Sequence, residues 1–325
     1  MKSYITTSYG EPETVVRLVA STKPTPKKDQ VLLKVKAAPV NDYDWCVTSG
    51  KPFAYRLLFG LSKPKRKFQK LGMEVAGIVE EVGPNVTKYK VGDELYGDIS
   101  DHEFGSFSEY LCTSERGLTK KPSFMSFEDA AAIPHAAMLA YEGLIDLGQI
   151  QGGQEILING AGGGMGTFAL QIAKTFNATV TGVDCGAKHQ SMQSLGFDKV
   201  IDYKKEDFTK NGQTYDLILD PRTSRSPFSF LRSLKQGGIY VTVGGRSGKL
   251  IQLLLFKGLI RLFTGKRVKM LGLRPNKYLD KINDLYEEGK VKPVIDGPHP
   301  FEKTPSLIKY FGEAQHKGKI VISIP

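Results

Sequence analysis

A glycine cluster after a short apolar run is the most informative group of residues in this sequence. The run at residues 155–159 leads into Ala161-x-Gly163-x-x-Gly166, and apolar residues at helical spacing follow to residue 176. Small residues at these places allow a tight turn, close approach of a pyrophosphate and packing of a helix on a strand. The N–H groups that begin such a helix also attract phosphate. The residues of the predicted dinucleotide-binding loop are Ala161, Gly162, Gly163, Gly164, Met165 and Gly166.

An acidic residue follows the next predicted strand. Residues 179–183 form a second apolar run, and Asp184 comes directly after it, eighteen residues past Gly166. In dinucleotide-binding folds a carboxylate near this spacing binds the hydroxyls of the adenosine ribose. Because a carboxylate repels a 2′-phosphate, Asp184 by itself favours NAD(H) over NADP(H).

Length and composition describe an ordinary globular protein. The 325 residues suffice for two domains, and 40% of them are hydrophobic and 24% charged. The first residues lack the apolar run of a secretory signal, and no stretch has the ~18 uncharged apolar residues of a membrane span, so we expect a cytoplasmic protein. The cysteines Cys46, Cys112 and Cys185 form no C-x-x-C pair, which excludes a disulfide framework and a cysteine-rich zinc site.

The predicted elements that position the glycine loop divide the chain into two kinds of sequence. Residues 1 to about 122 hold short β-like runs separated by glycines, which indicate a compact, mostly antiparallel β domain. These runs lie at residues 31–37, 75–82, 94–96 and 107–111.

From about residue 126, helical and strand-like segments alternate, which predicts a doubly wound parallel sheet. The first of these helices is expected at residues 128–147. A helical stretch after Pro275 and a last strand at residues 319–324 are expected to return to the β domain. The predicted domains are therefore 1–122 with 275–325, and 123–274.

Three further motifs carry a resemblance to a known family. They are Gly-Met-Glu-Val-Ala-Gly-Ile-Val-Glu-Glu-Val-Gly at residues 72–83, Val-Gly-Asp-Glu-Leu-Tyr-Gly at 91–97 and Gly-Lys-Ile-Val-Ile at 318–322. With the glycine loop, they make the chain resemble the medium-chain dehydrogenase/reductase superfamily over nearly its whole length. The resemblance implies an α/β protein with a GroES-like β-rich catalytic domain and a doubly wound Rossmann domain.

The resemblance also implies that no zinc is bound. The zinc-dependent branch of the superfamily uses cysteine, histidine and a third cysteine or carboxylate, and the corresponding positions here are Asn41, Met73 and the neighbourhood of His135. An amide and a thioether do not make a zinc site, and the cysteine-rich structural lobe is absent. A single histidine without a second ligand is more often a pocket or packing residue. We therefore predict no metal ligands.

The absence of metal ligands favours a particular reaction. Alcohol oxidation develops charge on one oxygen, where zinc acts as a Lewis acid. Hydride addition to a quinone or conjugated carbonyl spreads the charge, so that a few hydrogen-bond donors suffice. The chain resembles the zinc-independent quinone oxidoreductase branch of zeta-crystallin type, with its enone reductases. The motif of that branch, Asn, two residues, Asp, five residues, Gly, is present at Asn41, Asp44 and Gly50.

In that branch the matching Asn and Asp line the nicotinamide and substrate cleft, so Asn41 and Asp44 are the leading catalytic candidates. Asp44 has a second interpretation, a buried carboxylate that holds the loop backbone. Many relatives carry a tyrosine shortly after the glycine, whereas this chain has Lys-Pro-Phe at residues 51–53. The proton donor therefore stays open between Tyr43, Tyr55 and solvent.

Other residues bear on the choice of nicotinamide. Lys188 and Tyr203 fall where NADPH-using quinone reductases carry a lysine and a tyrosine around the 2′-phosphate, which favours NADP(H) despite Asp184. Lys317 or Lys319 is a candidate for a further basic contact. The alternative for Lys188 is a solvated residue in the first turn of a helix. A third group, Val243, Gly244 and Gly245, follows a predicted strand where backbone groups could approach the nicotinamide amide.

Basic segments make partners other than small molecules worth considering, since the formal net charge is +11. Residues 63–70 form a dense basic run, but no nucleic-acid-binding fold accompanies it, so nucleic acid is not an expected partner. Residues 249–269 combine apolar residues with periodic cations, the pattern of an interfacial helix that contacts a membrane peripherally. The favoured alternative is a homodimer interface or a substrate lid, because the superfamily usually dimerises through its nucleotide domains near this point.

Together these features predict a zinc-independent NAD(P)H-dependent oxidoreductase that reduces quinones or α,β-unsaturated carbonyls by hydride transfer. One alternative is a dehydrogenase or reductase of another carbonyl. The other is a nucleotide-holding binding protein at a membrane or on RNA with little turnover.

Overall fold

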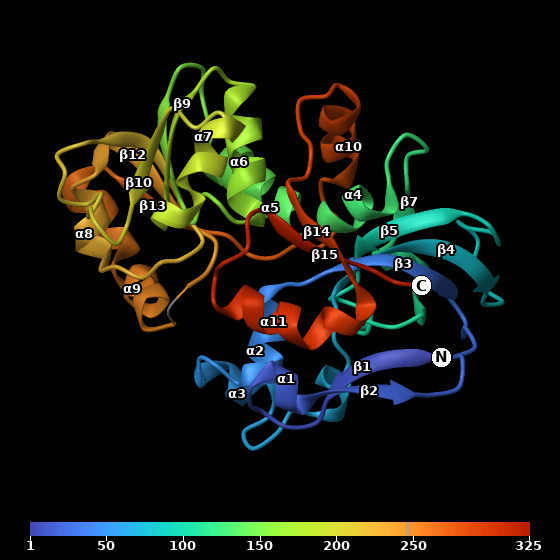
Figure 1. Ribbon diagram of the computed structural model, residues 1–325. Helices are drawn as coiled ribbons and strands as arrows, with labels where there is room; N and C mark the ends of the chain where they lie inside the picture. The colour runs from blue at the N-terminus through green and yellow to red at the C-terminus, as the bar shows by residue number, and fades with distance from the viewer. Residues whose placement is uncertain (246) are drawn as a thin grey trace. The chain divides into compact units, whose positions relative to one another are not determined.

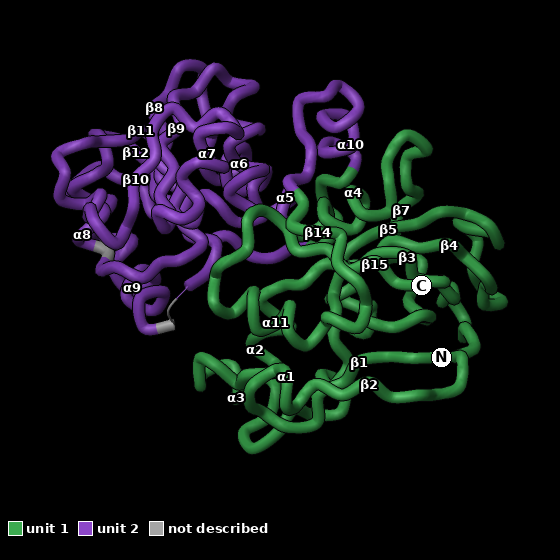
Figure 2. The backbone as a smooth tube through the Cα atoms, in the orientation of Figure 1, with its two compact units in different colours: residues 1–135, 275–279, 295–325 green, residues 136–274, 280–294 purple. Residues whose placement is uncertain are grey.

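The computed structural model describes residues 1–245 and 247–325. The chain forms two compact units (Figure 2). Unit 1 comprises residues 1–135, 275–279 and 295–325, and unit 2 comprises residues 136–274 and 280–294. Each unit is built on its own sheet. In the described part of the chain, no helix is long and apolar enough to cross a membrane.

Unit 1 is a β-rich unit whose main sheet has seven strands (Figure 1). Its order is β14-β15-β3-β4-β5-β7, and β6 also pairs with β3. All pairs are antiparallel except β14 with β15, and the last strand, β15, pairs with β3. The strands are β3 (Gln30–Pro39), β4 (Glu74–Val82), β5 (Glu94–Asp98), β6 (Tyr110–Ser114), β7 (Thr119–Lys120), β14 (Ile295–Pro300) and β15 (Lys319–Ser323).

The remaining elements of unit 1 surround this sheet. A separate antiparallel pair joins β1 (Lys2–Thr6) to β2 (Val16–Ala20). The α-helices are α1 (Pro12–Val15), α2 (Asp42–Ser49), α3 (Ala54–Phe59), α4 (Phe127–Ala132) and α11 (Thr304–Gly312). Strand β3 lies at the centre of the sheet, and its Val31, Leu33 and Val35 are fully buried in the core of the unit.

Two predicted elements of this region differ from the structure. The strand expected at 107–111 is β6 at 110–114, because Phe107 turns into the core and the Ser108 hydroxyl closes a turn onto the Gly105 carbonyl. The helix expected at 128–147 is broken into α4, α5 (Ala136–Tyr141) and a π-helical segment, Glu142–Leu147. Pro134 explains the break, because proline has no N–H to donate to a carbonyl of the preceding turn.

Unit 2 is a doubly wound parallel sheet, as predicted. Its six strands run in the order β10-β9-β8-β11-β12-β13, and every pair is parallel. The strands are β8 (Glu155–Asn159), β9 (Thr179–Asp184), β10 (Lys199–Asp202), β11 (Tyr215–Asp220), β12 (Leu234–Thr242) and β13 (Arg267–Met270). This is the Rossmann strand order, in which the direction of winding reverses beside the first strand, β8.

Helices cover both faces of this sheet (Figure 1), with α6 and α7 on one side and α8 and α9 on the other. They are α6 (Gly164–Lys174), α7 (His189–Leu195), α8 (Pro227–Leu231) and α9 (Ser247–Thr264). Helix α10 (Leu279–Glu287) follows the sheet. In such sheets, ligands bind beyond the carboxyl ends of the strands, next to the point where the winding reverses.

Candidate functional site

The glycine loop joins β8 to α6 at that reversal point. The N–H groups of Gly160 and Ala161 donate to the Val183 carbonyl of β9, at 2.8 and 3.1 Å. Helix α6 then begins directly after Gly163. A Cβ atom at Gly166 would lie 2.5 Å from the Ala161 carbonyl oxygen, so only glycine allows the helix to approach the loop this closely. The predicted strand, loop and helix are therefore confirmed.

Asp184 and Lys188 lie against this loop. The two Asp184 oxygens accept hydrogen bonds from the N–H groups of Gly162, at 3.0 Å, and Cys185, at 2.8 Å. The Lys188 Nζ atom is 3.5 Å from Asp184 Oδ1, and a Cβ at Gly162 would lie 2.7 Å from Lys188 Cδ. Only 1% of Lys188 is exposed, and its ammonium has no hydrogen-bond partner among the described residues. Lys188 is thus not the solvated helix residue of the alternative interpretation.

The other predicted cofactor residues of unit 2 follow neighbouring strands. Tyr203 comes directly after β10, its main-chain N–H donates to the Asp184 carbonyl at 3.2 Å, and half of its side chain is exposed. Val243, Gly244 and Gly245 follow β12. The sheet therefore brings the loop, Asp184, Tyr203 and the 243–245 segment to one edge, the carboxyl edge of its parallel strands.

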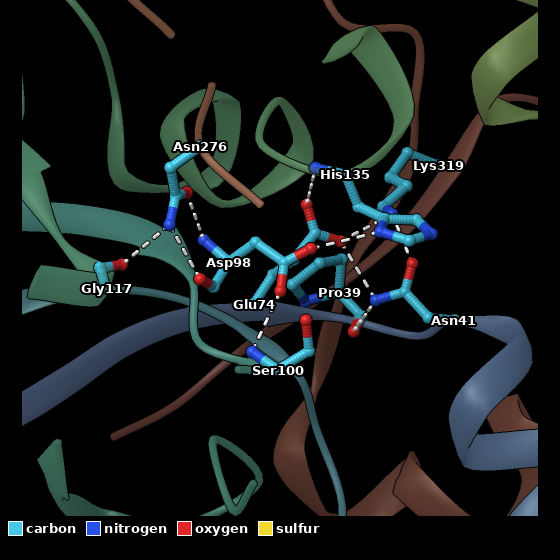
Figure 3. A network of polar contacts seen from close by, with 9 residues as sticks. All are labelled: Pro39, Asn41, Glu74, Asp98, Ser100, Gly117, His135, Asn276 and Lys319. Atoms are coloured by element: carbon cyan, nitrogen blue, oxygen red, sulfur yellow. Dashed lines mark hydrogen bonds and ion pairs between the residues drawn. The ribbon is translucent and has the colours of Figure 1, made fainter. Parts of the chain in front are cut away.

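Asn41 belongs to a buried polar cluster in unit 1 (Figure 3). Its Nδ2 donates to Glu74 Oε2 at 2.9 Å and, more weakly, to the Pro39 carbonyl at 3.4 Å. Its Oδ1 accepts from Lys319 Nζ at 2.5 Å, and the same ammonium lies 2.6 Å from Glu74 Oε2. Asn41 follows β3, Glu74 begins β4 and Lys319 begins β15, so the strand order β15-β3-β4 assembles the three side chains.

Lys319 is a predicted cofactor residue that belongs to unit 1. Its role as a basic contact to the 2′-phosphate stays a prediction, and both of its side-chain hydrogen bonds go to Asn41 and Glu74 in unit 1. The sequence shows that Lys319 is a basic residue near the C-terminus, but it does not show which strands will lie beside it. Glu74 itself was missed, and its position after Met73 in the family motif was the available signal.

His135 and Asp98 extend the cluster (Figure 3). The main-chain N–H of His135 donates to Glu74 Oε1 at 2.6 Å, and its Nδ1 lies 3.0 Å from Asp98 Oδ2. Burial lowers the pKa of His135, but the hydrogen bond and the charge of Asp98 outweigh burial and raise it. Burial likewise acts to raise the pKa of Asp98, and the bond to His135 lowers it overall. The pair therefore favours an imidazolium beside a carboxylate.

Asp44 and Tyr43 hold backbone. The Asp44 carboxylate accepts from the main-chain N–H groups of Asn41, at 2.9 Å, and Gly72, at 2.7 Å. Burial raises the pKa of Asp44 to about 7, although these two bonds act to lower it. The Tyr43 hydroxyl donates to the carbonyls of Phe68 and Lys70, at 3.3 and 3.1 Å. For Asp44 these contacts match the backbone-holding interpretation. In these contacts neither side chain bonds to the side-chain amide of Asn41.

The residues that correspond to the ligands of the zinc branch have other partners in the structure. Met73 is buried in the apolar core of unit 1, and the amide oxygen of Asn41 accepts from an ammonium group. His135 Nδ1 is hydrogen-bonded to the Asp98 carboxylate. Among the residues that the structure describes, no three His, Cys, Asp or Glu side chains gather in a way that could hold a metal ion. A cation as close as Lys319 would also repel a metal ion.

Comparison with known families supports the fold. Residues 27–123 match the alcohol dehydrogenase GroES-like domain, and residues 195–322 match the zinc-binding dehydrogenase family. Among solved structures, the quinone oxidoreductase from Coxiella burnetii superposes with a TM-score of 0.83 at 25% identity, covering 100% of this chain and 99% of the other. Escherichia coli quinone oxidoreductase complexed with NADPH gives a TM-score of 0.83 at 23% identity, covering 100% of both chains.

Curated relatives match over nearly the whole sequence. The 2-methylene-furan-3-one reductase of Solanum lycopersicum is 34% identical, over 99% of this chain and 79% of the relative. The chloroplastic NADPH-dependent alkenal/one oxidoreductase of Arabidopsis thaliana is 31% identical with the same coverage. The chloroplast envelope quinone oxidoreductase homolog of the same plant is 30% identical, over 97% and 96%. The chain therefore belongs to the medium-chain dehydrogenase/reductase superfamily, in the group of quinone and enone oxidoreductases.

Proposed function

We propose that the protein is a zinc-independent reductase that uses NADPH to reduce quinones or α,β-unsaturated carbonyls. The observation that carries this proposal is the buried Asn41–Glu74–Lys319 cluster, in which Asn41 stands at a position where the zinc branch has a metal ligand. Hydride addition to a conjugated system spreads negative charge, which an ammonium and amide donors can stabilise without a Lewis acid. The names of the relatives, an alkenal/one oxidoreductase and a quinone oxidoreductase homolog, agree with this chemistry.

The cofactor would lie on unit 2, where it supplies the hydride. The loop N–H groups and the start of α6 are suited to a pyrophosphate. We infer a preference for NADP(H) from Lys188, because a buried ammonium without a hydrogen-bond partner in the described chain is suited to a phosphate. Asp184 argues less strongly for NAD(H), because both of its oxygens already accept main-chain N–H groups. Tyr203, half-exposed at the same edge, is a further candidate for the phosphate.

In unit 1 we assign Asn41 and Lys319 to the substrate site. The amide of Asn41 bridges Glu74 and Lys319 and thereby fixes the ammonium in a buried position. Asp44 and Tyr43 act as positioning residues, since their polar atoms hold the main chain at residues 41, 68, 70 and 72. Their replacement is therefore expected to displace the neighbours of Asn41 before it affects the chemistry.

We further propose that the protein works in the cytoplasm and contacts an anionic membrane surface through α9. This helix buries Leu253 and Ile260 and exposes an apolar face. The members of the α9 apolar face are Ile251, Leu254, Leu255, Leu259 and Leu262. Residues 247–267 include five Lys or Arg and no acidic residue, so pairing of this helix with itself would bring like charges together, whereas anionic lipid would complement them. The expected homodimer would then use another surface, for which the edge strand β13 is available.

The proposal is tested by a screen of the purified protein for oxidation of NADPH and NADH with quinones, enals and enones. Turnover with these acceptors supports the reductase. Turnover only with other carbonyls favours a different carbonyl reductase. Binding of NADPH without turnover of any acceptor favours the nucleotide-holding binding protein.

A further inference from the structure

The His135–Asp98 pair is a buried, hydrogen-bonded pair of titratable side chains that has no role in the proposed function so far. The histidine is held at two points, by its main-chain N–H on Glu74 and by its Nδ1 on Asp98 (Figure 3). Asp98 is fully buried, and its other oxygen accepts the Ser100 N–H at 2.9 Å. Asp98 is anchored again through its main chain, which exchanges hydrogen bonds of 2.7 and 2.8 Å with the side chain of Asn276. The imidazole orientation is therefore set by a rigid support.

The second ring nitrogen of His135 has a different environment. Nε2 has no hydrogen-bond partner among the described residues, and 13% of the side chain is exposed. This is the arrangement of a general acid, in which a carboxylate on one nitrogen fixes the ring and leaves the other nitrogen for proton transfer.

The surrounding charges favour the protonated ring. Asp98, Glu74 and Asp42 are the carboxylates whose charge acts on His135. The Lys319 ammonium is the nearby cation, and it is paired with the Glu74 oxygen that does not bind His135. Tyr43, by contrast, donates its hydroxyl to two loop carbonyls, and burial raises its pKa above the ordinary tyrosine value. Of these two groups, His135 is the better proton donor near neutral pH.

We propose that His135 is the acid that completes enone reduction, by giving its Nε2 proton to the substrate. This inference rests on the proposed function. Hydride addition to the β-carbon moves the C=C electron pair into an enolate. The Nε2–H bond of His135 then breaks as a C–H bond forms at the α-carbon, which leaves a neutral imidazole and a saturated ketone. Water then restores the proton to Nε2.

Quinone reduction should depend less on His135 than enone reduction does. A reduced quinone carries its charge on phenolate-type oxygens, whose pKa resembles the value of about 10 for tyrosine, so water can protonate them directly. An enolate must instead be protonated on carbon, where a positioned acid matters more. Loss of His135 should therefore separate the two substrate classes, which a loss of folding or of cofactor binding would not do.

The test compares His135→Gln with His299→Gln. His299 is a matched control because its Nε2 also pairs with an aspartate, Asp296, at 3.2 Å, in strand β14. We expect His135→Gln to lower kcat for an enone by roughly 10²- to 10⁴-fold, the usual contribution of a general acid. Reduction of 1,4-benzoquinone and the Kd for NADPH should stay at the parental values. The control should leave all three unchanged.

Two further variants distinguish proton donation from a structural role. In His135→Ala, added imidazole should restore part of the enone rate. In the parent, kcat/KM for the enone should fall as pH rises through the raised pKa of His135, and Asp98→Asn should move this fall to lower pH. Parental enone rates in His135→Gln, or equal losses for enone and quinone without imidazole rescue, would overturn the assignment. A parent enzyme that reduces neither class would instead remove the proposed function.

Discussion

Lys188 Nζ lies 3.5 Å from Asp184 Oδ1, with both side chains almost completely buried against the glycine loop. The carboxylate offsets the charge of the ammonium, and its oxygens hold the loop N–H groups of Gly162 and Cys185. Lys188, from which we infer a preference for NADP(H), and Asp184, which by itself favours NAD(H), therefore form one ion pair. In this pair the lysine ammonium has no hydrogen-bond partner among the described residues, whereas both oxygens of the aspartate accept main-chain N–H groups.

Lys188→Ala should consequently change cofactor preference. Removing one charge-assisted contact to a phosphate costs ~1.5–3 kcal/mol, or about ten- to a hundredfold in Kd. NADH lacks the 2′-phosphate and should lose little. Fluorescence titration with both cofactors measures the effect. Lys174→Ala is a suitable control, because Lys174 pairs with Asp198 on the surface of the same unit. Equal losses for NADPH and NADH would make Lys188 a purely structural residue.

Asp44→Asn tests the backbone-holding role. One of the N–H groups of Asn41 and Gly72 would lose its acceptor, which costs about 1–3 kcal/mol in a buried setting. The pH dependence has a defined sign. Because burial raises the pKa of Asp44 to about 7, the folded state keeps a proton that the unfolded state releases nearer 3.8. The parental free energy of unfolding therefore falls as pH rises through this window.

The Asn variant lacks this titration, so the difference between the parent and Asp44→Asn should be larger at pH 5 than at pH 8. Urea unfolding at the two pH values measures it. Asp42→Asn, exposed on the same helix, should show neither effect. A difference that is independent of pH would mean that Asp44 stays ionised in the folded protein over the whole range.

Zinc content should be negligible, since an amide, a thioether and an aspartate-bound histidine stand at the expected ligand positions. Elemental analysis of protein purified without chelator measures this directly. About one zinc per chain, together with loss of activity on chelation, would contradict the zinc-independent assignment.

The membrane contact should depend on the α9 apolar face. Leu255 and Leu262 are 69% and 75% exposed, and burying each in lipid is worth about 1.5–3 kcal/mol. The double variant Leu255→Glu/Leu262→Glu should therefore lose binding to phosphatidylserine vesicles in a sedimentation assay. Leu273→Glu, at another exposed leucine of unit 2, should retain it. Two results would contradict this: parental protein that does not bind these vesicles, or a double variant that dissociates from dimer to monomer. Either result would mean that the α9 apolar face binds a second copy of the chain.

Short-range patterns predicted much of unit 2. The spacing of Ala161, Gly163 and Gly166 identified β8, the loop and α6, because each part is defined by residues close in sequence. The break at Pro134 was overlooked, since apolar spacing continues on both sides of it. That break has a consequence, because it leaves the His135 N–H outside a helix and able to bind Glu74.

Local sequence patterns could not predict the Asn41–Glu74–Lys319 cluster in unit 1. Glu74 and Lys319 begin strands, and Asn41 follows a strand, that are far apart in sequence and neighbours only in the sheet. Family resemblance indicated Asn41, but nothing in one sequence indicates that β15 lies beside β3. For the same reason neither the two partners of Lys319 nor the Asp98 partner of His135 was anticipated.

Reduction of quinones and enones without zinc is tested by comparing substrates under one set of cofactor concentrations. The comparison is between 1,4-benzoquinone and a simple enal with NADPH, and ethanol and a saturated ketone with NADP⁺ or NADPH. Without a Lewis acid, the transition state depends on donors such as Lys319 and on the delocalisation of the substrate itself. We expect kcat/KM to be highest for the quinone or the enal and negligible for ethanol and the saturated ketone. Efficient ethanol oxidation together with no measurable reduction of the quinone or the enal would show that the protein is not a zinc-independent quinone and enone reductase.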